Sequence, residues 1–192
     1  MMHADAIDFF YIFNLKMYTF KNPHISFATE EDRVSIKDLL NIAYRGEASK
    51  KGWTSEAELI AGDTRADDAM LQKLMEQQGS VFLKYTNDQH ELAGCVNLQQ
   101  HGEKIYLGMF SVSPHMQGAG IGKQILKAAE EYALHKKCNA IYMSVISLRT
   151  KLIKWYERSG YCDTGKRMPF VEDEITGRHL QPLEFMILEK SV

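Results

Sequence analysis

The sequence is short of several features that would indicate particular classes of protein. Its three cysteines are far apart, and none belongs to a CxxC pair. The seven histidines never fall at the spacing that metal ligands need. The sequence therefore predicts no metal site. It also predicts that Cys95, Cys138 and Cys162 are reduced thiols of a cytoplasmic protein, packed in the core.

Strong charge and long apolar runs are also missing. The formal net charge is −2, too weak to indicate binding to nucleic acid or to an anionic membrane. The densest apolar stretch, residues 7–15, contains Asp8 and is too short to span a bilayer. It also lacks the basic region and cleavage site of a secretory signal. We therefore expect neither nucleic acid nor membrane among the partners of this protein.

The composition is that of a soluble globular domain. Hydrophobic residues make up 45% of the 192 residues and charged residues 25%, a length that suits one domain better than two. We expect a single domain over residues 25–192, preceded by a leader over residues 1–24. Two interpretations of the leader stay open. Either Met17 is the true start and the preceding residues are loosely attached, or the leader forms an ordered helix.

Apolar periodicity predicts an α+β domain around a mixed, mostly antiparallel sheet. Gly46 and Gly52 are expected to break the chain after the first helix. The predicted helices cover 30–44, a short segment starting at 54–56, 67–78, 121–137 and 149–159. The predicted strands cover 25–28, 81–86, 92–99, 105–112, 140–145, 161–166 and 183–188.

A glycine-rich loop, Gln117-Gly118-Ala119-Gly120-Ile121-Gly122, lies between a predicted strand and a predicted helix. Glycine allows another molecule to approach the backbone closely, and a helix N-terminus presents unpaired N–H groups and a positive dipole end. The loop therefore predicts a cradle for a pyrophosphate. It fails the dinucleotide fingerprint at Lys123 and the P-loop pattern at Gln124. A tight strand-to-helix turn without a ligand is the alternative interpretation.

Two segments together resemble the GNAT superfamily of acyl-CoA-dependent N-acetyltransferases. The first has Gln117, Gly120 and Gly122 at the positions of a Q/R-x-x-G-x-G/A motif, preceded by Phe110-Ser111-Val112-Ser113-Pro114. The second, about thirty residues later, is Leu152 to Tyr161, which is similar to a helix with an aliphatic-x-x-Tyr-Glu-x-x-Gly-aromatic pattern.

The resemblance runs from about Ile25 to Lys190 and implies a fold. That fold is an α/β/α sandwich whose mixed, mostly antiparallel sheet has six to seven strands, flanked by four to five helices. Two parallel strands splay apart in the sheet, and acetyl-CoA binds in the cleft between them. The resemblance thus implies acetyl-CoA as the co-substrate and an amine as its acceptor.

The resemblance also implies which residues bind acetyl-CoA. The backbone of Phe110 and Val112 would hydrogen-bond the pantetheine arm, and the loop N–H groups would bind the pyrophosphate. Lys123 would add a point charge. Arg149 stands where the family often has asparagine, and it either reaches a phosphate of the cofactor or faces solvent. The predicted set is Phe110, Ser111, Val112, Gln117, Gly118, Ala119, Gly120, Ile121, Gly122, Lys123 and Arg149.

Tyr156 matches the position where the family places its general acid. A phenol with a pKa near 10 and a thiol with a pKa near 8.5 differ by about 1.5 units, so full proton transfer is uphill by about 2 kcal/mol. Its implied role is therefore to stabilise developing negative charge on the departing sulfur. Alternatively, Tyr156 only packs beside Leu152 and Ile153 at helical spacing.

The sequence says less about the acceptor side. A lysine-like amine with a pKa near 10.4 needs about 4.6 kcal/mol to become neutral at pH 7. The strand before the glycine loop has neither carboxylate nor histidine over Tyr106 to Val112. The base is therefore elsewhere, such as Glu47, or is a chain of water molecules. Glu47 and Trp53 are candidates for substrate contact, with a surface glutamate and a core tryptophan as the alternative.

These observations predict an N-acetyltransferase that moves an acetyl group from acetyl-CoA to a primary amine by direct attack. A covalent enzyme intermediate is disfavoured because no cysteine lies in or beside the motifs except Cys162. A small-molecule amine is the favoured acceptor, and a protein or peptide amine is the alternative. A non-catalytic acyl-CoA-binding module is the rival from another class. The sequence leaves a homodimer open.

Overall fold

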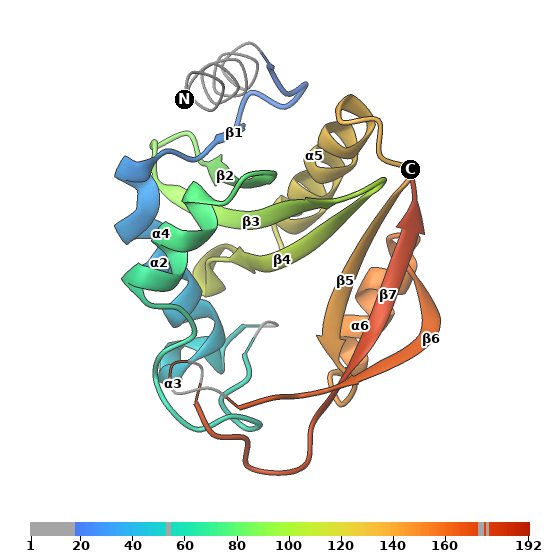
Figure 1. The fold of residues 1–192 in the computed structure, drawn as a ribbon. Coiled ribbons are helices and arrows are strands. Elements are labelled where there is room, and N and C mark those ends of the chain that lie inside the picture. The colour runs from blue at the N-terminus through green and yellow to red at the C-terminus, as the bar shows by residue number, and fades with distance from the viewer. Residues whose placement is uncertain (1–17, 53–54, 173–174, 176) are drawn as a thin grey trace, which may run out of the picture.

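The computed structural model describes residues 18–52, 55–172, 175 and 177–192. Their centre is a seven-stranded sheet in the order β1-β2-β3-β4-β5-β7-β6, in which only β4 and β5 pair in parallel (Figure 1). The predicted mixed sheet is therefore confirmed. The strands are β1 (Ile25–Phe27), β2 (Ser80–Thr86), β3 (Leu92–His101), β4 (Lys104–Val112), β5 (Ala140–Ile146), β6 (Cys162–Pro169) and β7 (Glu184–Ser191).

Five α-helices flank the sheet within the described ranges, as predicted. They are α2 (Arg33–Tyr44), α3 (Gly46–Ser49), α4 (Asp68–Glu76), α5 (Ile121–His135) and α6 (Thr150–Arg158), with 3-10 turns η1 (Glu30–Asp32) and η2 (Pro114–Met116). No helix in these ranges is both long and apolar enough to cross a membrane.

The helices cover both faces of the sheet, because alternate residues of a strand point to opposite sides. On β2, Val81 and Leu83 join the core cluster formed with α5 and α6, whereas Phe82 joins the cluster formed with α2 and α4. Figure 1 shows α2 and α4 on one side of β3 and β4, and α5 on the other. The fold is therefore the predicted α/β/α sandwich.

The parallel ladder between β4 and β5 is short. It pairs Lys104 to Tyr106 with Ala140 to Tyr142, and beyond it the two strands diverge (Figure 1). The hydroxyls of Tyr106 and Ser144 lie 2.9 Å apart and bridge the two strands just past the ladder. The splayed parallel pair is thus confirmed, and it opens toward the ends of β4 and β5.

A β-bulge bends β4 inside this opening. Between Gly108 and Ser111 the strand has one residue more than β3 has between Asn97 and Cys95. Met109 takes up the bulge with a φ of 46°, in the left-handed region. The following residue, Phe110, faces α6, where its ring stacks on Trp155 with centroids 6.0 Å apart.

The segment between α2 and α4 differs from the prediction. Gly46 begins a short helix, α3, instead of only breaking the chain. The helix predicted to start at 54–56 is wrong over the described residues: Thr54 lies outside them, and residues 55–60 form turns that end in a bridge from Ile60 to His179. In place of a helix, Ile60 pairs with His179, a residue far along the chain, and the local sequence pattern contains no signal for such a contact.

Candidate functional site

The glycine loop has a backbone conformation that glycine favours. Gly118 and Gly120 have φ values of 92° and 80°, a region that L side chains rarely adopt. Gly120 is the N-cap residue of α5, and no side chain caps the first turn of that helix. A Cβ added at Gly118 or Gly120 would meet no atom within 4 Å. The N–H groups of the first turn therefore face open space, as an anion cradle requires.

A hollow of about 270 Å³ lies against this loop. Residues of the predicted cofactor set line it, together with the apolar side chains of Met116, Leu152 and Trp155, and with Tyr156. The predicted residues in its wall are Phe110, Val112, Gln117, Gly118, Gly120, Ile121, Gly122 and Lys123. The other predicted residues lie elsewhere: Ser111 is fully buried in the sheet, and Ala119 is exposed on the loop.

The backbone carbonyls of Phe110 and Val112, two residues expected to bind a pantetheine arm, already have partners. The Tyr44 hydroxyl donates to the Phe110 carbonyl over 2.7 Å, and the Gln117 side-chain amide donates to the Val112 carbonyl over 3.0 Å. Burial raises the pKa of Tyr44 to about 12, so its hydroxyl remains a donor at neutral pH. The first bond ties the end of α2 to β4, and the second ties the end of β4 to the start of the glycine loop.

Tyr156 lies on α6 at the junction of two hollows and lines both. Its ring packs against Trp155 and Tyr161, with centroid distances of 5.1 Å and 5.9 Å. Among the described residues, no group forms a hydrogen bond with its hydroxyl. Burial, and secondarily the neighbouring Tyr44, raise the pKa of Tyr156 well above 10. Tyr156 is thus a neutral donor whose hydroxyl is available to a bound molecule.

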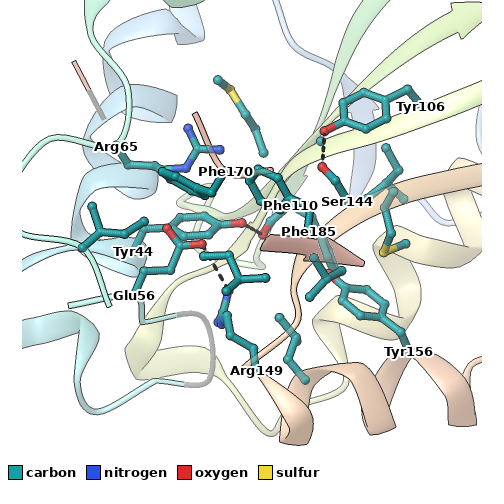
Figure 2. A pocket seen from close by; sticks show the side chains of 18 of the residues that line it. Tyr44, Glu56, Arg65, Tyr106, Phe110, Ser144, Arg149, Tyr156, Phe170 and Phe185 are labelled. Atoms are coloured by element: carbon teal, nitrogen blue, oxygen red, sulfur yellow. Dashed lines mark hydrogen bonds and ion pairs between the residues drawn. The ribbon is translucent and has the colours of Figure 1, made fainter. Parts of the chain in front are cut away.

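The second hollow, of about 340 Å³, lies in the opening between β4 and β5 (Figure 2). It shares Phe110, Leu152 and Tyr156 with the first. Its wall combines apolar side chains from the sheet and from the segment before β7 with a charged cluster from α2, the loop after α3, and the start of α6. The charged residues are Arg45, Glu56, Arg65 and Arg149.

Glu56 is the centre of this charged cluster. Its oxygens lie 2.6 Å from an Arg45 nitrogen and 3.4 Å from an Arg149 nitrogen, and the exposed fractions of these three side chains are 10%, 1% and 9%. The backbone N–H of Glu56 donates to the Tyr44 carbonyl over 2.9 Å, which ties the loop to the end of α2. Sequence reasoning missed Glu56 because its neighbours resemble a helix start. Its partners Arg45 and Arg149 are 11 and 93 residues away, so no local pattern indicates the contacts.

The remaining predicted site residues either lie outside the two hollows or line a different hollow from the one predicted. Glu47 is exposed and pairs with Lys50, so its predicted role in substrate contact finds no support in its position. Trp53 lies outside the described residues. Arg149 lines the second hollow beside Glu56 and does not line the wall of the glycine-loop hollow. The described contacts of Arg149 therefore do not support the expectation that it reaches a phosphate of the cofactor.

The buried ion pair gives a testable expectation for stability. Replacing Glu56 with glutamine removes the carboxylate that Arg45 contacts, while Arg45 stays buried. We expect a loss of about 3 kcal/mol in the free energy of unfolding, because breaking a buried pair leaves a charge without compensation. Urea unfolding of the two proteins, followed by circular dichroism, measures the difference.

Glu47→Gln is the matched control, since Glu47 is an exposed partner of Lys50. Its midpoint in urea should equal that of the parent protein. Equal midpoints for Glu56→Gln and the parent would show that the cluster does not stabilise the fold.

No group of three or more metal-ligating side chains occurs within the described ranges. That a resident metal is lacking stays a prediction from the sequence.

The two hollows share Phe110, Leu152 and Tyr156 in their walls, and the part of the chain that forms most of them matches a known family. A model of the acetyltransferase (GNAT) family matches residues 36–161. The chain belongs to this family. Both motifs that carried the resemblance, the glycine loop and the helix with Tyr156, lie within the matched residues.

Curated relatives and solved structures agree with this assignment. The chain is 33% identical over 64 residues to a probable spermine N(1)-acetyltransferase of Bacillus subtilis subsp. natto (strain BEST195), covering 33% of this chain and 42% of the relative. It is 28% identical over 108 residues to the thialysine N-epsilon-acetyltransferase of Mus musculus, covering 56% and 61%. The matches thus span between about two fifths and three fifths of these relatives.

Two solved structures share the fold. The ribosomal-protein-S18-alanine N-acetyltransferase from Escherichia coli superimposes with a TM-score of 0.65 at 13% identity, covering 88% of this chain and 92% of that one. A GCN5-related N-acetyltransferase from Kribbella flavida gives 0.63 at 16% identity, covering 88% and 96%. At these identities the likeness establishes the fold, and the chemistry must be argued from the site.

Proposed function

We propose that this protein is an N-acetyltransferase that moves an acetyl group from acetyl-CoA to a primary amine by direct attack. One observation carries the proposal: the hollow at the glycine loop and the hollow between β4 and β5 meet at Phe110, Leu152 and Tyr156. A donor molecule in the first and an acceptor in the second would meet beside the Tyr156 hydroxyl. Such a junction is what a transfer between two substrates requires.

The glycine loop fits coenzyme A. The cradle is free of side chains at Gly118 and Gly120, and the N-terminal N–H groups of α5 point into it. Lys123 follows within the first turn, where a positive charge would favour phosphate. The apolar part of this hollow, with Trp155 and Phe110, would enclose the pantetheine arm. When bound, acetyl-CoA supplies an acetyl group activated as a thioester.

Tyr156 supplies the hydrogen bond at the reacting end. Its raised pKa makes full proton transfer to a thiolate unfavourable, so the hydroxyl acts by stabilising negative charge that develops on the sulfur. The amine nitrogen forms the new bond to the acetyl carbon while the bond from that carbon to sulfur breaks. After the attack the nitrogen loses a proton to solvent, and the departing thiolate takes one up. An amine that begins as the ammonium must first lose a proton so that its nitrogen can attack.

The carboxylate of Glu56 is poorly placed to take that proton. Its two oxygens contact the guanidinium groups of Arg45 and Arg149. We therefore assign Glu56 to holding these arginines in place, and assign deprotonation of the amine to water that enters the second hollow. The sequence left two options for the base, Glu47 and a chain of water molecules. This assignment retains the water chain and abandons Glu47.

A small-molecule amine is the proposed acceptor. The second hollow, of about 340 Å³, has the size of a small-molecule site. The named acceptors of the two curated relatives, spermine and thialysine, are also small-molecule amines. A protein or peptide amine, favoured by no observation on this chain, is the alternative that the test addresses.

The test is release of free thiol from acetyl-CoA in the presence of a panel of primary amines. We expect acetylation of at least one small amine, with the thiol and the acetylated amine formed in equal amounts. Binding of coenzyme A without turnover of any small or peptide amine would instead indicate the non-catalytic module. Turnover of peptides alone would show that the acceptor is a peptide or protein amine and not a small-molecule amine.

The remaining expectations from the sequence belong to the same proposal. We place the protein in the cytoplasm, supported by the free state of Cys95, Cys138 and Cys162. Cys95 and Cys138 are buried as predicted, whereas the predicted core packing is wrong for Cys162, which is exposed on β6. We treat residues 25–192 as the N-acetyltransferase domain and residues 1–24 as its leader. A homodimer, and the absence of nucleic acid and membrane among its partners, stay predictions.

A further inference from the structure

Among the described residues, the wall of the second hollow carries more positive than negative charge. Three arginines and one glutamate supply all the formal charge that the described residues place in its wall, which leaves two positive charges. Two of the arginines, Arg45 and Arg149, share the carboxylate of Glu56. An acceptor that carries several positive charges, as spermine does, would meet repulsion here.

Arg65 is the third arginine of this wall, and in the described structure it does not pair with Glu56. Its guanidinium lies over the ring of Tyr44, 5.3 Å from the centroid, and within the described part of the chain it forms no ion pair with a carboxylate. A cation held against an aromatic face keeps its hydrogen-bond donors available at its edge.

The backbone at Arg65 is held in place. The Asn41 side chain accepts from the N–H of Arg65 over 2.6 Å and from the N–H of Ala66 over 3.0 Å, and it donates to the Ala66 carbonyl over 3.0 Å. Ala66 is fully buried. The guanidinium is therefore presented from a fixed anchor, not from a free loop.

Arg65 and Tyr156 lie on opposite sides of the hollow, with Phe110 between them (Figure 2). The rings of Phe170 and Phe185, 5.1 Å apart, add to the apolar wall. A molecule that reached from one side to the other would thus have a polar group at each end and an apolar middle. The amine end belongs at Tyr156, where the acetyl group is transferred under the proposed function.

We propose that the acceptor is a primary amine joined through an apolar body to a carboxylate, and that Arg65 binds this carboxylate. The proposal rests on the proposed acetyltransferase function and narrows its acceptor. A guanidinium binds a carboxylate through two parallel hydrogen bonds, which gives both orientation and affinity. The negative end also offsets the excess positive charge of the hollow.

Three probes of matched length test the proposal: ε-aminocaproate, hexylamine and hexamethylenediamine. They place a carboxylate, a methyl group and an ammonium, respectively, at the end opposite the amine. We expect kcat/KM for acetylation to be about tenfold or more higher for ε-aminocaproate than for hexylamine, and lowest for hexamethylenediamine. Calorimetric binding of each probe to the protein saturated with coenzyme A should give the same order.

Variants then assign the preference to Arg65. Arg65→Met should lower the ratio of ε-aminocaproate to hexylamine to about one, and Arg65→Lys should retain part of it. Arg158→Met is the matched control, because Arg158 is an exposed arginine of α6 that lines neither hollow. It should keep the full ratio. Thermal unfolding of each variant verifies that the fold is intact.

The two readouts separate this inference from the proposed function. Acetylation of hexylamine with equal turnover and binding of all three probes would overturn the inference and leave the function standing. Tighter binding of ε-aminocaproate without acetylation of any probe would support the inference and overturn the function. A preference for hexamethylenediamine, a preference that survives in Arg65→Met, or no binding of any probe would overturn the inference.

Discussion

Replacing Gly120 with glutamate should abolish binding of coenzyme A, with a loss of affinity of at least about a hundredfold, or about 3 kcal/mol. The new carboxylate would stand at the N-cap of α5, where the pyrophosphate is expected, and would repel it. The cradle is open because a Cβ at this position meets nothing within 4 Å, so the substitution fills a space that the parent protein keeps empty. Calorimetry with coenzyme A measures the effect.

Two controls separate charge from backbone strain. Gly120→Gln has the same size and the same unfavourable φ of 80° without the charge, so it should lose clearly less affinity. Gly102→Glu places the same charge at another glycine with a positive φ, in the turn between β3 and β4 and away from the loop. It should bind as the parent does. Parent-like affinity in Gly120→Glu would refute the cradle.

Replacing Tyr156 with phenylalanine should lower kcat at least tenfold, or about 1.4 kcal/mol in activation free energy, with the affinity for coenzyme A within about twofold. The phenylalanine ring keeps the packing against Trp155 and Tyr161 but removes the one hydroxyl at the junction of the two hollows. Steady-state kinetics and calorimetry on the same preparations measure the two quantities.

Tyr161→Phe is the matched control for this substitution. Tyr161 is also buried, it lines neither hollow, and its hydroxyl has no hydrogen-bond partner in the described structure. Its loss should leave kcat unchanged. If Tyr156→Phe turned over as fast as Tyr161→Phe, the hydroxyl of Tyr156 would have no part in the reaction.

The pH dependence of the rate follows from the same tyrosine. Its pKa is raised well above 10, chiefly by burial, so the donating, protonated form persists to at least about pH 10. The rate should rise up to at least about pH 10 as the acceptor amine loses its proton, with no fall within that range. A fall in rate near pH 9 that disappears in Tyr156→Phe would contradict the assignment.

Local sequence patterns predicted most of the fold and singled out most of the residues that line the glycine-loop hollow. The glycine loop was recognisable because backbone conformation, helix start and residue type coincide within six positions, and the structure gives Gly118 and Gly120 the positive φ values that they suggest. Tyr156 was recognisable because its helix follows at a typical separation. Both features lie within the residues that the family model matches.

The acceptor side could not be predicted in the same way. Glu47 and Glu56 both follow α2 closely in the sequence, and only the path of the chain after α3 decides that Glu56 turns inward to Arg45 while Glu47 stays exposed. Arg149 and Arg65 likewise acquire their neighbours from distant segments. A hollow assembled from side chains far apart in sequence leaves no local periodicity for sequence reasoning to detect.

The short ladder between β4 and β5 also affects how this sheet interacts with other chains. Free strand edges usually face solvent, where they can recruit a second polypeptide and start aggregation. Here the strands part after only three residue pairs, and residues of both strands past this ladder, such as Phe110 and Val145, line the second hollow. The unpaired stretches of β4 and β5 therefore border the site, whereas the outer edges of the sheet are formed by β1 and β6. A strand of another chain would find an edge to pair with at β1 or β6, and not at this interior opening.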